Sequence, residues 1–355
     1  MYPLLFEPIY KEMIWGGRRL SDRYGRCAPS DHTGESWNIS CREKDMSRVS
    51  NGQYAGMAFS DLIGEFGGES RIKWLGRRFA AGIFPLLVKI IDANDNLSIQ
   101  VHPDDALARD LEGEPNGKSE MWYVLEAPES GSLIIGLKDG VTREALEKAI
   151  RANDGHAVED MLGRLPVKRG DVVYIPAGLL HAITKGVMVA EIQQNSDITY
   201  RLYDYDRKGP DGKPRQLKTD KALQAVDFDN SGKKTAAPGL KITGTPFTYY
   251  IANRNFCAIL YELDGALYTE RSDPEKFYIF TCVEGSCDIK TASHTASLTE
   301  SCSVLIPAAL GEYAIESKYC RLLKSFVPDI DRDFYLPLLN AGYTKQEIKT
   351  AIRKS

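Results

Sequence analysis

The side chains of Gln100 and His102 are of a kind that can bind a metal ion, and their spacing would let them do so together. They lie two apart in the segment LSIQVHPDDA, residues 97–106. Residues two apart in a β-strand point to the same face of the sheet, so both side chains would enter one space. Pro103 has no N–H to donate, and the two aspartates after it favour a turn, so the strand is expected to end there. The pair is therefore either a solvated rim or one half of a metal site.

Glu120 and His181 could complete such a site. In a small barrel, the inward positions of neighbouring strands meet in one cavity. Glu120 begins the strand predicted after residues 103–119, and His181 follows the turn PAGLL. Two imidazoles, one carboxylate and one amide oxygen suit a borderline divalent ion, most simply one Zn²⁺ per chain with water in the open position. This set carries one negative charge, so the ion would keep more Lewis acidity than it would among thiolates, which favours catalysis over a purely structural role.

The elements that must position these residues are mostly short strands. Runs rich in β-branched and aromatic residues predict strands at 84–92, 98–102, 120–127, 132–138, 171–177 and 197–205. Gly, Pro, Asn and Asp separate these runs, as in an antiparallel barrel or sandwich. Helices are predicted at 56–66, at 142–165 with Thr142 as the cap, and in the C-terminal segment TKQEIKTAIRKS.

The strands form two similar sets. Segments 168–183 and 299–315 both contain an apolar strand, the tripeptide Ile-Pro-Ala and a turn into another strand. This weak internal duplication predicts a mainly β fold with two cupin-type jelly-roll barrels. The predicted ranges are 1–207 for a metal-binding catalytic domain with a helical insertion at 141–165, 208–245 for a linker, 246–330 for a second barrel without a metal site, and 331–355 for a C-terminal helical tail.

The duplication supplies a control within the chain. The first copy has His181 after Ile-Pro-Ala, whereas the second has Glu312 and Tyr313 near that place and nothing that matches the Gln-x-His pair. If these polar residues served folding alone, both copies should keep them. The difference predicts that the site of the first unit is chemical and that the second unit is structural.

The composition excludes several classes of protein. The 355 residues are 43% hydrophobic and 26% charged, as in an ordinary globular protein long enough for two domains. A formal net charge of −4 without a long basic run argues against nucleic-acid partners, and no apolar run approaches the ~20 residues of a membrane span. The N-terminus does not have the pattern of a signal peptide.

The cysteines and the other histidines are predicted to have no role in chemistry. Seven cysteines without a CxxC pair make a disulfide framework improbable and fit a reducing cytoplasm. Cys282 and Cys287 are expected to be buried thiols. His32, His156 and His294 lie in polar, turn-like segments and are expected at the surface.

Six segments spread over the first 207 residues carry a family resemblance. They are PIYKEMIWGGRRL (8–20), GESWNIS (34–40), LSIQVHPDD (97–105), GKSEMWYVL (117–125), IPAGLLHAI (175–183) and EIQQNSDITYRLYDYDR (191–207). Together, and in this order, they resemble the type I mannose-6-phosphate isomerases in their short bacterial form. Members of this family are zinc-dependent cupins that interconvert mannose 6-phosphate and fructose 6-phosphate. The remainder of the chain is similar, more loosely, to the C-terminal barrel of the family.

The resemblance implies roles for individual residues. Gln100, His102, Glu120 and His181 would be the zinc ligands, and Arg201 in TYRLYD would be the active-site arginine. Lys118 and Lys89 match lysines of the family's pocket, Ser98 matches a serine beside it, and Asp197 matches an acid beside the arginine. Apart from the resemblance, Trp15 is a candidate for lining the substrate pocket, with packing in the core as the favoured alternative. Longer members carry His and Pro where this chain has Gly117 and Ser119, so no proton-transfer role for a histidine is implied there.

Lys89 and Arg201 each allow two interpretations from the residues alone. Lys89 interrupts the apolar run FPLLVKIID, so it is either a lysine that extends to solvent from a barrel edge or a buried lysine. Near zinc, a buried lysine would have a lowered pKa and could act as a base or in ring opening. Arg201 would share a face with Asp197 if the strand ran straight, so it is either held by this acid for the substrate or part of an exposed ion pair.

Three functions remain to be separated. The first is a sugar-phosphate isomerase that works through a cis-enediol, with a small-molecule substrate and a monomeric or weakly dimeric chain. The second is another metal-dependent cupin enzyme such as an oxygenase, although the added Gln weakens that case. The third is a non-enzymatic, sugar-binding cupin regulator. Nothing in the sequence resembles the Gly-rich loop of a nucleotidyltransferase, which excludes the bifunctional type of the enzyme.

Overall fold

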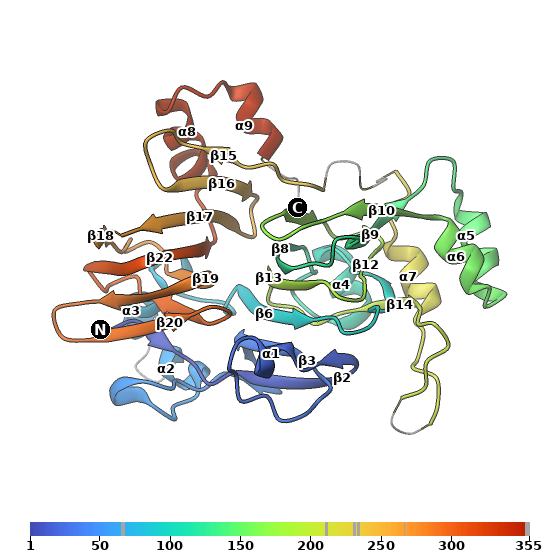
Figure 1. Cartoon of the computed structure of the whole chain (residues 1–355), viewed down its shortest axis with the longest axis horizontal. Coiled ribbons are helices and arrows are strands. Elements are labelled where there is room, and N and C mark those ends of the chain that lie inside the picture. Colours follow the sequence, from blue (N-terminus) through green and yellow to red (C-terminus); the bar gives the residue numbers. More distant parts are fainter. Residues whose placement is uncertain (65–67, 210–211, 230–231, 233–234, 266, 352–355) are drawn as a thin grey trace. The chain divides into compact units, whose positions relative to one another are not determined.

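The computed structural model describes residues 1–64, 68–209, 212–229, 232, 235–265 and 267–351. The chain is mainly β and divides into two compact units (Figure 1). Unit 1 comprises residues 1–9, 36–90 and 238–354, and unit 2 comprises residues 10–35 and 91–237. The chain therefore passes between the units four times. The segments expected as contiguous domains differ from this division, since 36–90 groups with the C-terminal part, and their assignment as domains stays a prediction.

Unit 2 contains two antiparallel sheets. Sheet I has the order β10 (Leu162–Pro166), β9 (Ser132–Leu137), β12 (His181–Ile183), β7 (Ile99–Val101) and β14 (Tyr200–Tyr203). Sheet II has the order β11 (Val172–Ile175), β8 (Glu120–Glu126), β13 (Met188–Gln194), β6 (Leu86–Asp92), β3 (Thr33–Ile39) and β2 (Ile9–Gly17). Strands β2, β3 and β6 carry the chain across the boundary between the units.

Two apolar clusters use opposite faces of sheet I. One lies between the sheets and includes Leu133 and Ile135 of β9 with Trp122 and Val124 of β8. The other contains Ile99 and Val101 of β7 and the apolar faces of helices α4 (Asp105–Glu112), α5 (Arg143–Arg151), α6 (Gly155–Asp160) and α7 (Thr219–Ala225). Because side chains alternate along a strand, burying Ile99 and Val101 under the helices turns Gln100 toward sheet II.

Unit 1 is built on one large antiparallel sheet. Its main path runs β1 (Leu4–Leu5), β21 (Ser303–Ile306), β19 (Tyr278–Lys290), β22 (Glu312–Phe326), β17 (Cys257–Asp264), β16 (Phe247–Ala252) and β15 (Leu240–Lys241). Strand β18 (Leu267–Arg271) pairs with β22, and β20 (Thr295–Thr299) pairs with β19. Helices α8 (Leu336–Asn340) and α9 (Lys345–Ala351) pack their apolar residues on the core of this sheet.

The remaining elements of the chain are short. They are the strands β4 (Cys41–Arg42) and β5 (Asp45–Met46), the helices α1 (Arg19–Asp22), α2 (Phe59–Gly64) and α3 (Gly68–Leu75), and the single turns Gly52–Tyr54, Arg77–Phe79 and Asp331–Tyr335. In the part of the chain described above, no helix is both long enough and apolar enough to cross a lipid bilayer.

Most predicted elements are confirmed. Each of the six strands is present, α2 lies within 56–66 (65 and 66 fall outside the described residues), and α9 forms with Ile348 and Ala351 buried. Thr142 caps α5 by accepting a hydrogen bond from the Ala145 amide. All seven cysteines are free thiols, Cys282 and Cys287 are buried, and His32, His156 and His294 are exposed.

Two predictions of local structure were wrong. Helix 142–165 stops after α5, where Asn153 has a φ of 52°, and a second short helix begins under the cap of Asp154. Residues 162–166 then form β10, which pairs with β9, so Leu162 belongs to a strand. The segment 208–245, expected as a plain linker, contains α7 and β15. Lysine-rich polarity concealed the apolar face of α7, where Ala222 and Leu223 are buried.

Candidate metal centre

Strand alternation and register bring the four predicted ligands together in unit 2. Gln100 of β7 is paired directly with His181 of β12, and both face sheet II. Glu120 begins β8 with the same parity as Trp122 and Val124, which pack between the sheets. His102 follows β7 on the side of Gln100. The convergence expected from the sequence is thus present, with His102, Glu120 and His181 almost completely buried.

The donor atoms are close enough to bind one ion, since one ligand atom from each of His102, Glu120 and His181 lies within 4.8 Å of the others. His102 Nε2 lies 3.6 Å from Glu120 Oε2, His181 Nε2 lies 3.5 Å from Glu120 Oε1, and Gln100 Nε2 lies 3.3 Å from His181 Nε2. Two atoms bound to zinc at ~2.1 Å with tetrahedral angles stand roughly 3.4 Å apart. Turning the Gln100 amide by 180° would present its oxygen in place of Nε2, because the two ends have nearly the same shape.

Both imidazoles are held with Nε2 toward this centre. His102 Nδ1 lies 2.8 Å from the carbonyl oxygen of Ile198, and His181 Nδ1 lies 2.8 Å from that of Leu179. A carbonyl can only accept, so Nδ1 carries the hydrogen and Nε2 keeps its lone pair. Burial lowers the pKa of His181 to about 4, further lowered by Lys118 and opposed by the Leu179 carbonyl and Glu191. The ring is therefore neutral at pH 7, as a ligand must be.

The buried carboxylate of Glu120 is a strong indication that a cation binds here. Both of its carboxylate oxygens are buried and, within the described part of the chain, neither accepts a hydrogen bond of good geometry. Lys118 Nζ lies 2.8 Å from Oε2 and also 3.2 Å from His102 Nε2. A buried carboxylate without hydrogen bonds is costly, and a bound cation would remove that cost. The donor set therefore fits a divalent metal.

Arg201 lies next to the centre on strand β14. It is paired with Gln100 across β7, its Nε donates to Ser98 Oγ at 3.1 Å, and its Nη1 donates to the Gln216 carbonyl at 3.1 Å. Burial lowers the pKa of Arg201, with Arg215 acting in the same direction and Asp204 opposing. The structure thus brings Arg201 and Ser98 into contact, while their roles toward a substrate stay predictions.

Comparison with known proteins shows the family to which this chain belongs. Residues 4–131 match the model of the phosphomannose isomerase type I catalytic domain, and residues 246–327 match that of the mannose-6-phosphate isomerase cupin domain. The chain is 34% identical over 314 residues to the mannose-6-phosphate isomerase ManA of Bacillus subtilis, covering 88% of this chain and 96% of that protein. The chain belongs to the mannose-6-phosphate isomerase family.

Other relatives of the family agree. The mannose-6-phosphate isomerase of Streptococcus mutans is 34% identical over 314 residues, covering 88% of this chain and 95% of that protein. The crystal structure of the mannose 6-phosphate isomerase from Bacillus subtilis matches with a TM-score of 0.81 at 33% identity, covering 92% of this chain and 99% of that one. The fold of a phosphomannose isomerase from Salmonella typhimurium, a mutant at 17% identity, is also matched, with a TM-score of 0.71.

The other residues implied by the family resemblance lie in varied surroundings. Trp15 is buried in the cluster between the sheets of unit 2, with Trp122 and Leu97. Asp197 is exposed and precedes β14, which begins only at Tyr200. In unit 1, Lys89 of β6 is buried, and its Nζ lies 4.4 Å from the ring centroid of Trp37. The roles of these three residues stay predictions.

Sequence reasoning missed Trp122 and Glu191 as neighbours of this family's centre. The Trp122 indole lies edge-on to the His181 ring, with centroids 5.5 Å apart, and its Nε1 donates to Glu191 Oε2 at 3.0 Å. The two residues are paired in β8 and β13. The available signal was a carboxylate at the middle of the apolar strand MVAEIQQ, where a buried charge requires a partner.

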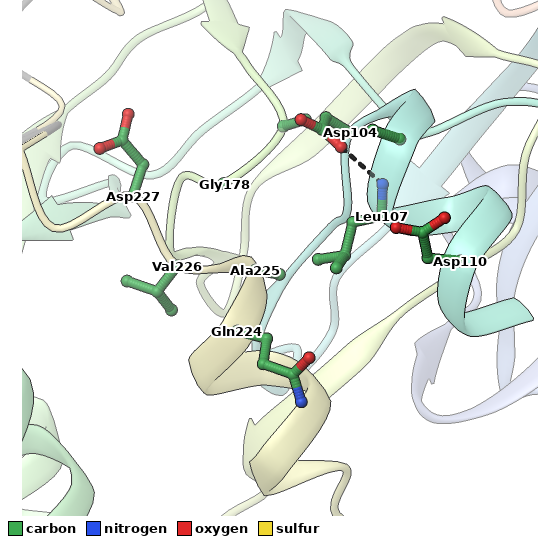
Figure 2. Close-up of a pocket in the computed structure, with 10 residues that line it drawn as sticks. Asp104, Leu107, Asp110, Gly178, Gln224, Ala225, Val226 and Asp227 are labelled. Atoms are coloured by element: carbon green, nitrogen blue, oxygen red, sulfur yellow. Dashed lines mark hydrogen bonds between the residues drawn. The ribbon is translucent and has the colours of Figure 1, made fainter.

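A pocket of about 490 Å³ lies beside the ligand-bearing turns of unit 2 (Figure 2). It is lined by Asp104, Leu107 and Asp110 near α4, by Gly178, and by residues 224–227. The Gly178 amide donates to the His102 carbonyl at 2.9 Å, so a residue of the pocket wall holds the backbone of the predicted ligand His102. None of the four predicted ligands lines this pocket. Figure 2 shows Asp104 capping α4 through the Leu107 amide at 2.8 Å.

Proposed function

We propose that this chain is a zinc-dependent aldose–ketose isomerase that interconverts mannose 6-phosphate and fructose 6-phosphate. The observation that supports this most directly is the buried group of Glu120, His102 and His181, with Lys118 and Arg201 beside it, in a chain of this family. The relatives are named for this reaction. We infer a small-molecule sugar phosphate as the partner, a cytoplasmic location and a monomeric or weakly dimeric chain.

The metal and its ligands supply part of the chemistry. We infer that His102, His181, Glu120 and Gln100 hold one zinc ion, which would act as a Lewis acid worth several kcal/mol in the transition state. The neutral imidazoles and the neutral amide leave Glu120 as the single anionic ligand. The His102 and His181 rings are already oriented by the Ile198 and Leu179 carbonyls, so these two rings need no reordering to bind the ion.

The reaction moves a proton between C1 and C2 of the sugar through a cis-enediol. We infer that Lys118, almost buried and close to His102 and Glu120, exchanges or guides this proton, with Lys89 as the second candidate. A positioned general base is typically worth ~10²–10⁴ in rate. Arg201, held by Ser98 and Gln216, would orient the sugar oxygens or the phosphate, with Asp197 and Trp15 as further substrate contacts.

A coupled assay separates this proposal from a sugar-binding regulator and from another cupin enzyme. The purified protein is loaded with zinc, given mannose 6-phosphate, and followed for fructose 6-phosphate, before and after treatment with a chelator. We expect turnover that chelation removes and zinc restores. Absence of turnover in the protein with a measured full zinc content would reject the isomerase function.

A further inference from the structure

We propose that Asp105 and Gln194 are positioning residues that fix the loop Gly117–Ser119 and so place the Lys118 ammonium against the metal centre. The proposal rests on the proposed function for its catalytic consequence. Its structural part concerns the loop alone and can be tested separately. Neither residue is among the predicted ligands or among the residues implied by the family resemblance.

Asp105 holds the first end of the loop. It lies in the first turn of α4, three residues after His102, and its Oδ1 accepts a hydrogen bond from the Gly117 amide at 2.9 Å. The same oxygen accepts from Gln194 Nε2 at 2.9 Å. One carboxylate oxygen therefore joins the loop, the helix and the end of strand β13.

Gln194 holds the second end of the loop. Its side-chain Oε1 accepts from the Ser119 backbone N–H at 2.9 Å, and its backbone N–H donates to the Ser119 carbonyl at 3.1 Å. Gln194 is 5% exposed, so its side chain is buried with both ends of the amide used. The residues on either side of Lys118 are thus bound to a single Asp105–Gln194 pair.

The backbone completes this attachment. The Lys118 amide donates to the Pro103 carbonyl at 3.0 Å, so each N–H from Gly117 to Ser119 is hydrogen-bonded. A Cβ on Gly117 would come within 2.4 Å of the Asp104 carbonyl carbon, which means that the loop lies directly on the turn after His102. The turn that follows the predicted ligand His102 therefore also fixes the backbone of Lys118.

This arrangement decides where the ammonium lies. Lys118 is 4% exposed, and its Nζ is within 3.2 Å of His102 Nε2 and 2.8 Å of Glu120 Oε2. A lysine side chain has several rotatable bonds, so these contacts require a fixed backbone beneath it. Partners that orient such groups are typically worth 10- to 100-fold in metal affinity or activity. We assign Asp105 and Gln194 to the activity part of this range, because their hydrogen bonds reach the loop rather than the imidazoles.

Three variants test the pair. Gln194→Glu keeps an acceptor for the Ser119 amide but sets a carboxylate against Asp105, so kcat should fall roughly 10- to 100-fold while KM changes little. Asp105→Asn keeps Oδ1 as an acceptor for Gly117 and Gln194 and should remain near the wild type. The double variant Asp105→Asn with Gln194→Glu offers an amide donor to the new carboxylate and should recover most of the lost kcat. Asp110→Asn, an exposed residue of the same helix, is the matched control.

Two readouts do not depend on isomerase activity. Zinc affinity, measured by competition with a chromophoric chelator, should change less than threefold in all four variants. Hydrogen exchange in the peptide that contains residues 113–120 should accelerate in Gln194→Glu alone and return toward the wild type in the double variant. Unchanged exchange and unchanged kcat in Gln194→Glu would overturn the proposal. A double variant no better than Gln194→Glu, or zinc affinity that falls in step with kcat, would also overturn it.

Discussion

Each unit of the molecule contains a buried lysine paired with a glutamate, and the two pairs have different neighbours. In unit 2, Lys118 Nζ lies 2.8 Å from Glu120 Oε2, with side-chain exposures of 5% and 0%. In unit 1, Lys324 of β22 forms an ion pair with Glu270 of β18, with side-chain exposures of 5% and 17%. The two sites therefore differ in the residues that surround the same kind of ion pair.

In unit 1 the pair is enclosed by phenols and rings. Glu270 Oε2 accepts from the Tyr313 hydroxyl at 2.7 Å, and Oε1 accepts from Tyr261 at 3.2 Å. Lys324 Nζ donates to the Tyr261 hydroxyl at 3.1 Å and lies 3.6 Å from the centroid of the Tyr278 ring. Burial lowers the pKa of Lys324, while Glu270 opposes that shift. Both carboxylate oxygens of this glutamate are satisfied by the protein.

In unit 2 the corresponding neighbours are two imidazoles with oriented Nε2 atoms, and the carboxylate oxygens lack good hydrogen bonds. The same pair of charges is thus part of a fully hydrogen-bonded network in one unit and part of a candidate metal site in the other. What distinguishes the candidate metal centre from the ion pair of unit 1 is the residue type beside the carboxylate. Four predictions follow from this difference, in decreasing size of effect.

Replacing Glu120 by Gln or His102 by Ala should abolish stable zinc binding. Loss of the ion removes several kcal/mol of transition-state stabilisation, which corresponds to roughly 10²- to 10⁴-fold in kcat/KM. Metal analysis of the purified variants and the coupled assay measure both effects. If either variant keeps one zinc per chain at wild-type affinity, the assignment of that residue as a ligand is wrong.

Replacing Glu270 by Ala should instead affect stability. It leaves the Lys324 charge buried among aromatic rings, and breaking such a pair costs about 3–5 kcal/mol. Urea unfolding measures the loss, and kcat per bound zinc in the folded protein should be unchanged. The double variant Lys324→Met with Glu270→Gln is the control and should recover most of the stability. Zinc loss from folded Glu270→Ala would show that the two pairs are not separate in function.

His181 should make the stability of the metal-free protein fall as the pH is lowered from 6.5 toward 4. The folded pKa is lowered from 6.5 to about 4, so the unfolded chain takes up the proton first as pH falls. The stabilisation is therefore complete above pH 6.5 and is lost as pH falls toward 4, by about 2–3 kcal/mol. Urea unfolding at pH 7.5 and 4.5 measures the loss. The His181→Gln variant should lose that much less stability than the wild type over the same interval, and equal losses would contradict the assignment.

Arg201→Ala should lower kcat about 10- to 100-fold at unchanged zinc content, because the proposed role of the guanidinium is to orient the substrate and not to bind the metal. Arg321→Ala in unit 1 is the matched control: its guanidinium pairs with Glu262 on the sheet of that unit and should leave kcat unchanged. Loss of bound zinc from Arg201→Ala would show that the arginine supports the ligands.

Features that depend on neighbouring residues in the chain were predictable. Side-chain alternation was sufficient to place Gln100 and His102 on one face, and Thr142 was recognised as a cap. Features that depend on distant segments were not. Gln194 gains its importance from hydrogen bonds to Ser119 and Asp105, which are 75 and 89 residues away. No local sequence pattern predicts these hydrogen bonds.

The failures of local prediction have similar causes. The break at Asn153 depends on a positive φ, which Asn adopts more readily than most residues but which its presence does not require. Strand β10 forms because Leu162 and Leu165 find partners on β9, although their spacing also suited a helix. The grouping of residues 36–90 with 238–351 rests on contacts between segments far apart in sequence, such as the hydrogen bond from the Phe277 amide to the Leu75 carbonyl and the packing of Phe84 on Phe277, which composition does not reveal.

The fourfold passage of the chain between its units limits how this protein can be divided. A stop codon after residue 237 would retain the described residues of the unit with the candidate metal centre, yet it would remove strand β21, with which β1 pairs, and the residues that form hydrogen bonds with segment 73–78. Cutting the chain at this one position would therefore not give two pieces that each keep their own strand partners and hydrogen bonds. Any change that separates the two units has to replace these contacts, so the unit that holds the four predicted ligands is tied to the unit that does not.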